Sequence, residues 1–191
     1  MDFRQQLRSC LSLVVFFVCV GPAESWADDW GHWRGPKGNG VSTEATPPTE
    51  WSETKNVNWK VAIEGRGSGS PVVWGERVVV VTAVSTGRSS RESDDFSGRR
   101  GRRSGLYCYT MDGQLVWKRD DFGKMQTRNA FGEGSSPTIS GSKIIVPWDH
   151  DGPSALYALD KLTGKTLWKT NRDEPTNWST PLIVENDGQK Q

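Results

Sequence analysis

The segment Ala158–Trp168, ALDKLTGKTLW, decides the fold of this chain. It begins in the apolar stretch 155–160 and ends in a second short stretch, 165–169. Thr163-Gly164 lies between the two, and glycine beside a small polar residue is typical of a tight turn. The segment is therefore predicted to form two antiparallel strands joined by a turn.

The motifs on either side of this segment recur in a fixed order along the chain. Trp-Lys dipeptides begin at positions 59, 117 and 168, spaced 58 and 51 residues apart. Each is followed by a Ser-Pro or Thr-Pro step and then by an apolar stretch; the steps lie in Gly69–Val72, Ser135–Thr138 and Ser179–Leu182. The shortest intervals give a unit of 43 residues, close to the roughly 40 to 50 residues of a four-stranded propeller blade.

Each unit also has hairpin signals after its proline step. Residues 71–74 and 77–81 flank a short polar turn, and residues 137–140 and 143–146 repeat the arrangement. With the two strands at the end of the unit, this makes four strands per unit. Helical periodicity is almost absent, so the sequence predicts an all-β fold: a β-propeller with four-stranded blades, incomplete, with about two to three blades present.

The opening segment resembles the tryptophan-docking motif of pyrroloquinoline-quinone-like (PQQ-like) β-propeller repeats, with the spacing A-x-D-x-x-T-G-x-x-x-W. The motif positions are occupied by Ala158, Asp160, Thr163, Gly164 and Trp168. In the preceding unit Gly113 and Trp117 keep the four-residue offset, whereas Cys108 replaces the alanine and Thr110 the aspartate. The resemblance covers roughly Trp30–Leu182.

This resemblance implies blades that interlock through their tryptophans, with the indole of one blade packed over the Gly and Ala of a neighbour. A large aromatic ring buries about 150 to 250 Å², and only a residue without a large side chain leaves room beneath it. Trp117 and Trp168 are therefore expected to be buried between adjacent blades. Cys108 is expected to be a small buried substitute for alanine and not a reactive thiol.

The N-terminus is predicted to be a secretory signal peptide, residues 1–27. Arg4 and Arg8 precede an apolar run of 11 residues, and Ser25 and Ala27 are small residues suited to cleavage after position 27. The run is shorter than the about 18 residues of a membrane span, so no transmembrane segment is expected. The protein is predicted to be exported to the periplasm or the extracellular space, as an N-terminal fragment of an exported bacterial family member with its propeller part in residues 28–191.

Charge and composition point away from nucleic acid as a partner. The formal net charge is +1, which gives no bulk attraction to a polyanion. Ser85 to Ser104 is rich in arginine, serine and glycine and is predicted to be a disordered insertion. A polyanion-binding loop is the alternative interpretation of that segment.

Candidate catalytic and metal residues are scarce in this sequence. Asp149-His150-Asp151 could supply metal ligands, but the Gly152-Pro153 that follows favours a turn. Trp148 and Trp178 could stack on a flat ring or pack between blades. The prediction is therefore that this chain supplies no catalytic, cofactor-binding or metal-binding residue and needs no cofactor.

Two functions remain open at this point. The favoured hypothesis is a non-catalytic scaffold that binds other proteins through blade edges and rim loops, similar to the propeller component of outer-membrane protein assembly. The alternative is a fragment of a quinone-dependent dehydrogenase, with PQQ as cofactor, whose catalytic residues lie outside this chain. Fold alone does not decide between them.

The sequence also predicts that this chain alone is an incomplete propeller. It contains two full units, preceded by a strand near Asn58-Trp59-Lys60 and followed by the start of another blade at Pro181. Propellers need about four to eight blades, so open blade faces are expected to drive association.

Overall fold

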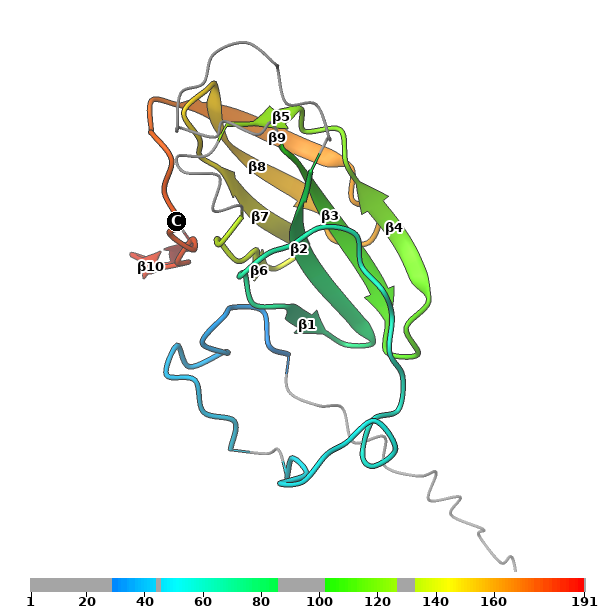
Figure 1. Ribbon diagram of the computed structural model, residues 1–191. Coiled ribbons are helices and arrows are strands. Elements are labelled where there is room, and N and C mark those ends of the chain that lie inside the picture. Colours follow the sequence, from blue (N-terminus) through cyan, green and yellow to red (C-terminus); the bar gives the residue numbers. More distant parts are fainter. Residues whose placement is uncertain (1–28, 44–45, 86–101, 127–132, 191) are drawn as a thin grey trace, which may run out of the picture.

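The computed structural model describes residues 29–43, 46–85, 102–126 and 133–190, and all regular structure within these ranges is β-strand (Figure 1). The first blade is a sheet in which consecutive strands are neighbours, with a short extra strand, β5, paired to β3. Its strands are β1 (Val72–Trp74), β2 (Arg77–Ser85), β3 (Arg102–Thr110), β4 (Leu115–Arg119) and β5 (Lys124–Met125).

The second blade is a four-stranded antiparallel sheet with the same order of neighbours. Its strands are β6 (Thr138–Ser140), β7 (Lys143–Trp148), β8 (Ser154–Asp160) and β9 (Thr166–Arg172). Two four-stranded units of this kind confirm the predicted all-β fold with four-stranded blades. Among the described residues there is no helix long and apolar enough to cross a membrane.

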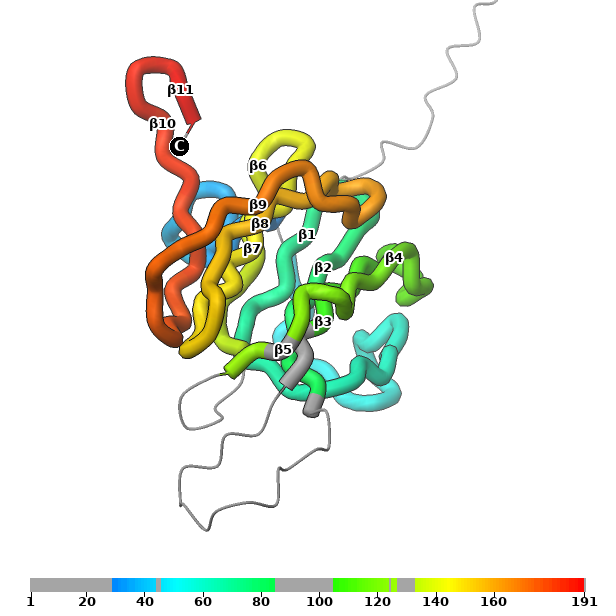
Figure 2. Tube along the Cα trace, turned by 90° about the horizontal axis from the view of Figure 1, so that it is seen from above, coloured from blue at the N-terminus to red at the C-terminus, as the bar shows by residue number. Residues whose placement is uncertain are grey.

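The two blades pack face to face around one apolar core (Figure 2). The first blade contributes Val72, Val79, Val81, Leu106, Cys108 and Met125, and the second contributes Ile144, Val146, Trp148, Ala155, Tyr157 and Leu159. Most of these side chains recur at every second position of their strands, as expected when one face of a sheet is buried. Blade packing, and not a separate hydrophobic layer, therefore builds the interior.

The two blades share the same irregularity in strand pairing. In each, the register between the third and fourth strands shifts at the same point, between Cys108 and Tyr109 in the first and between Ala158 and Leu159 in the second. Burial raises the pKa of Cys108 to about 11, and its side chain has no exposed surface. The thiol is therefore protonated at neutral pH, in line with its predicted role as a small core residue.

Two predicted strands differ in the structure. The segment around Trp59 forms no strand, and neither does the segment 181–184. A short hairpin follows instead, β10 (Glu185–Asn186) with β11 (Gln189–Lys190). A strand needs a neighbour for its backbone hydrogen bonds, and no described strand pairs with either segment.

The arginine-rich insertion is shorter than the sequence predicted. Ser85 and residues 102–104 were assigned to a disordered loop, but they belong to β2 and β3, where Ser85 pairs with Arg102 and Ala83 with Ser104. The prediction was wrong at both ends. It was based on polar composition, which indicates contact with solvent, whereas the backbone hydrogen bonds that pair β2 with β3 can form with any side chain. Residues 86–101 lie outside the described residues.

Replacing residues 86–101 with a short turn should leave the first blade intact, because loop length contributes little to the free energy of folding. We expect the free energy of unfolding to change by less than about 1 kcal/mol, measured by urea titration of the β circular-dichroism signal. Deleting 85–104 removes paired residues of β2 and β3 and the partners of β5, so that variant should lose clearly more. Equal losses from the two deletions would contradict the strand boundaries.

Candidate functional site

The turn between β8 and β9 is built by its own side chains. Asp160 Oδ1 accepts hydrogen bonds from the Thr163 amide at 2.8 Å and the Thr163 hydroxyl at 2.7 Å. These bonds hold the pKa of Asp160 below its ordinary value. The Gly164 amide donates to the Asp160 carbonyl, which closes the turn. The D-x-x-T-G spacing thus folds locally into what we call the docking turn of the second blade, residues 160–165.

Gly164 of this docking turn lies directly against Trp117 of the first blade. A Cβ atom on Gly164 would come within 2.7 Å of the indole, and the glycine has φ of +70°, so a side chain is excluded by both contact and backbone conformation. Arg119 reaches the same turn, donating to the Gly164 carbonyl and to Thr166 Oγ1. The structure therefore brings Trp117 and Gly164 together.

The first blade has an equivalent docking turn, residues 110–114, that is one residue shorter. Here Thr110 Oγ1 accepts from the Gln114 amide in place of an aspartate. Trp59 lies over Gly113, and its indole N–H donates to the Met111 carbonyl. Although 57–63 forms no strand, Trp59 thus occupies the place that Trp117 takes on the second blade.

Trp168 does not lie between blades, contrary to expectation. It is 39% exposed, whereas Trp117 is half-buried and packs against the core. The reason is that the described residues contain no docking turn beyond β9. The alanine position also differs from expectation: Ala158 is the cross-strand partner of Trp168 within its own blade, as Cys108 is of Trp117.

The proline steps form a second connection between the repeats. The Ser70 amide donates to Ser136 Oγ at 2.8 Å, and the Ser136 amide donates to Thr180 Oγ1 at 3.0 Å. Ser70 and Ser136, the residues before the first two prolines, therefore each donate to the hydroxyl at the same position of the next repeat. We call this the Ser/Thr-Pro ladder. The sequence revealed its residues as strand starts but not their mutual bonds.

Residues 29–40 form a strap along the inner edges of both blades. The Val73 amide of β1 donates to the Trp30 carbonyl, and the Ile139 amide of β6 donates to the Gly31 carbonyl. Gly35, with φ of +72°, lets the strap fold back so that Trp30 packs on it; a Cβ there would lie 2.7 Å from the indole. Sequence reasoning did not foresee this contact.

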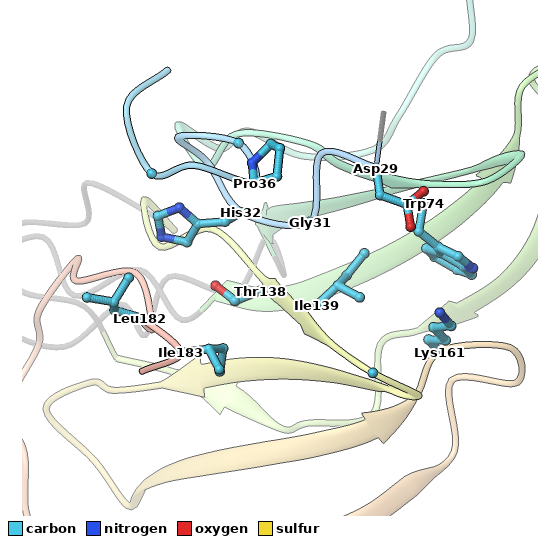
Figure 3. Close-up of a pocket in the computed structure, with 13 residues that line it drawn as sticks. Asp29, Gly31, His32, Pro36, Trp74, Thr138, Ile139, Lys161, Leu182 and Ile183 are labelled. Carbon is cyan, nitrogen blue, oxygen red and sulfur yellow. The ribbon is translucent and has the colours of Figure 1, made fainter. Parts of the chain in front are cut away.

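A cavity of about 450 Å³ lies between the strap and the second blade (Figure 3). We call it the strap pocket. Asp29, His32 and Pro36 lie on the strap side, and Ile139 and Lys161 face them. Its other lining residues are Gly31, Gly35, Gly38, Trp74, Thr138, Gly141, Leu182 and Ile183. Its volume falls in the range of small-molecule sites.

The loop between β7 and β8 is a tightly bonded turn. His150 Nδ1 accepts from the Gly152 amide at 2.9 Å, and burial lowers the pKa of His150. Asp151 accepts from Thr176, and Asp149 accepts from Asn177. Asp149 also pairs with Arg172 at 3.0 Å. These bonds fasten the segment after β9 to the second blade, and within the described residues no His, Cys, Asp or Glu side chains gather in a group able to hold a metal ion.

Residues 84–188 match the family described as outer membrane protein assembly factor BamB, whose domain is a PQQ-like propeller repeat. The chain belongs to this family. The match covers just over half of the sequence and includes both docking turns and the whole second blade. None of the curated proteins matches the chain.

Solved structures include chains similar to this family member. One is described as a europium-containing methanol dehydrogenase, with a TM-score of 0.32 and 14% sequence identity. The similarity covers 60% of this chain and 26% of that enzyme. The chain thus corresponds to about a quarter of the enzyme's length.

Removing the tryptophan in the fourth strand of each blade should have unequal effects. Trp117→Ala should lower the free energy of unfolding by about 3 kcal/mol, the lower end for a large aromatic, because it leaves a hole over Gly164. Trp168→Ala should cost less, about 1 kcal/mol, because no docking turn of the described residues lies against its ring and it is 39% exposed. Urea unfolding of the two variants measures the difference, and equal losses would contradict the packing described here.

Replacing Gly35 with alanine should weaken the hydrogen bonds between the strap and the two blades, whereas the same replacement at Gly40 should not. Gly35→Ala places a methyl group against Trp30, whereas Gly40 has a similar φ of +77° and open space where its Cβ would lie, with no atom within 4 Å. Amide hydrogen exchange at Val73 and Ile139 should become at least about tenfold faster in Gly35→Ala only. The β7–β8 ladder amides provide the internal reference. Unchanged exchange in Gly35→Ala would show that the strap does not protect these edges.

Proposed function

We propose that this chain is part of an exported, non-catalytic scaffold that binds other proteins through blade edges and rim loops. The family match supports this role, because the family is described by an outer-membrane protein assembly factor.

The outer strand of the second blade is the observation that supports the proposal most. Every residue of β9 is exposed, including Leu167 at 49% and Trp168 at 39%. An exposed strand edge presents unpaired backbone groups as well as side chains, and such edges bind extended segments of other proteins. Leu162, in the docking turn just before β9, is 66% exposed.

Export is the second part of the proposal. It rests on the predicted signal peptide at 1–27, which lies outside the described residues, and on Cys108, the single cysteine after that segment, which is buried and free. A free buried thiol with a raised pKa is protected from oxidation in an oxidising compartment.

Site-specific photocrosslinking in the native host tests the scaffold role. A photoreactive residue in place of Leu167, on the exposed edge, should give discrete protein adducts, whereas the same residue in place of Glu53, which is exposed but distant from β9 in sequence and fold, is the matched control. Adducts should be lost when Trp168 is also replaced by alanine.

Binding of a quinone cofactor with dehydrogenase activity would contradict the scaffold proposal. Incubation of the protein with PQQ and calcium should give no stoichiometric uptake after dialysis and no alcohol-dependent dye reduction. Stoichiometric uptake with dye reduction, or an absence of edge-specific adducts, would refute the scaffold proposal.

A further inference from the structure

The strap pocket contains hydrogen-bond donors that the protein itself leaves uncommitted. Lys161 lines it from the docking turn of the second blade, and its Nζ lies 5.5 Å from the centre of the Trp74 ring. None of the ion pairs formed among the described residues includes Lys161. Lys161 is half-buried, and an ammonium group without a carboxylate partner favours an anion beside it.

His32 lines the opposite end of the pocket, on the strap side (Figure 3). Its Nδ1 accepts from the Arg34 amide at 3.2 Å, so in the neutral ring the proton is on Nε2. Burial and the nearby Arg34 lower the pKa of His32, which keeps the ring neutral at pH 7. The carboxylate of the pocket, Asp29, already accepts from the Gly75 amide at 2.6 Å.

The remaining wall of the pocket is apolar. Trp74, Ile139, Leu182 and Ile183 line it, with Pro36 opposite on the strap. Thr138 also lines the pocket, but its hydroxyl donates to the Pro181 carbonyl. An uncommitted ammonium group at one end and hydrocarbon along the wall are complementary to a molecule with one acidic group and an apolar body.

We propose that the strap pocket binds a small organic carboxylate, with its acid group at Lys161 and its apolar body against Trp74, Ile139 and Leu182. The volume of about 450 Å³ accommodates a body of two fused rings or a branched chain. This site is formed by the strap and the turn end of the second blade, away from the exposed β9 edge. The inference is therefore independent of the scaffold role.

Equilibrium dialysis of the full chain against 2-naphthoate tests the proposal, since it counts bound probe whatever the association state of the chain. Binding should be saturable, and the uncharged 2-naphthamide should bind at least about tenfold more weakly, the effect of losing one charge-assisted contact. Lys161→Met should weaken naphthoate binding by a similar factor, and Lys161→Arg should restore most of it.

Lys165→Met is the matched control, because Lys165 is an exposed lysine of the same docking turn that does not line the pocket. It should bind naphthoate like the unaltered chain. Gly35→Ala, which disturbs the strap, should also weaken binding. The proposal is overturned if naphthoate binding is not saturable, if the amide binds equally well, or if Lys161→Met and Lys165→Met behave alike.

Discussion

The contact of an indole with a glycine turn of the next blade is the interaction on which the arrangement of this molecule depends. Trp59 over Gly113 and Trp117 over Gly164 repeat it at successive blades. The contact needs a residue without Cβ, since the ring comes within van der Waals distance of the backbone, and it needs a left-handed turn, which glycine adopts without strain. One small residue therefore fixes where each large ring lies, and with it the spacing of the blades.

Three sets of contacts hold the two blades together: the docking turns, the Ser/Thr-Pro ladder and the strap. The docking turns lie at one end of the strands, since Asp160 pairs with Lys143 beside the β6–β7 turn. The Ser/Thr-Pro ladder lies at the other end, where β6 begins, and the strap joins the inner edges. The outer strand β9 is left exposed, whereas the strap side has an open pocket with a mixed polar and apolar lining.

The sequence by itself determined the strands of the two blades, their grouping in fours and the docking turn that follows the third strand of each. These are local properties: D-x-x-T-G closes through bonds between residues at most four apart, and strand patterns follow side-chain alternation. The family relation could also be predicted, because Gly164 and its neighbours keep the spacing that the turn requires. Export remains a prediction.

Only the tertiary structure decided which tryptophans are covered, how the proline steps bond and what the N-terminal segment does. Trp117 and Trp168 have the same local sequence signal, yet a neighbouring turn covers only the first. The strap joins Gly31 to Ile139, far apart in the sequence, and the pocket exists only where the strap meets the second blade. Such contacts are set by the relative position of blades, and no local pattern of residue types specifies them.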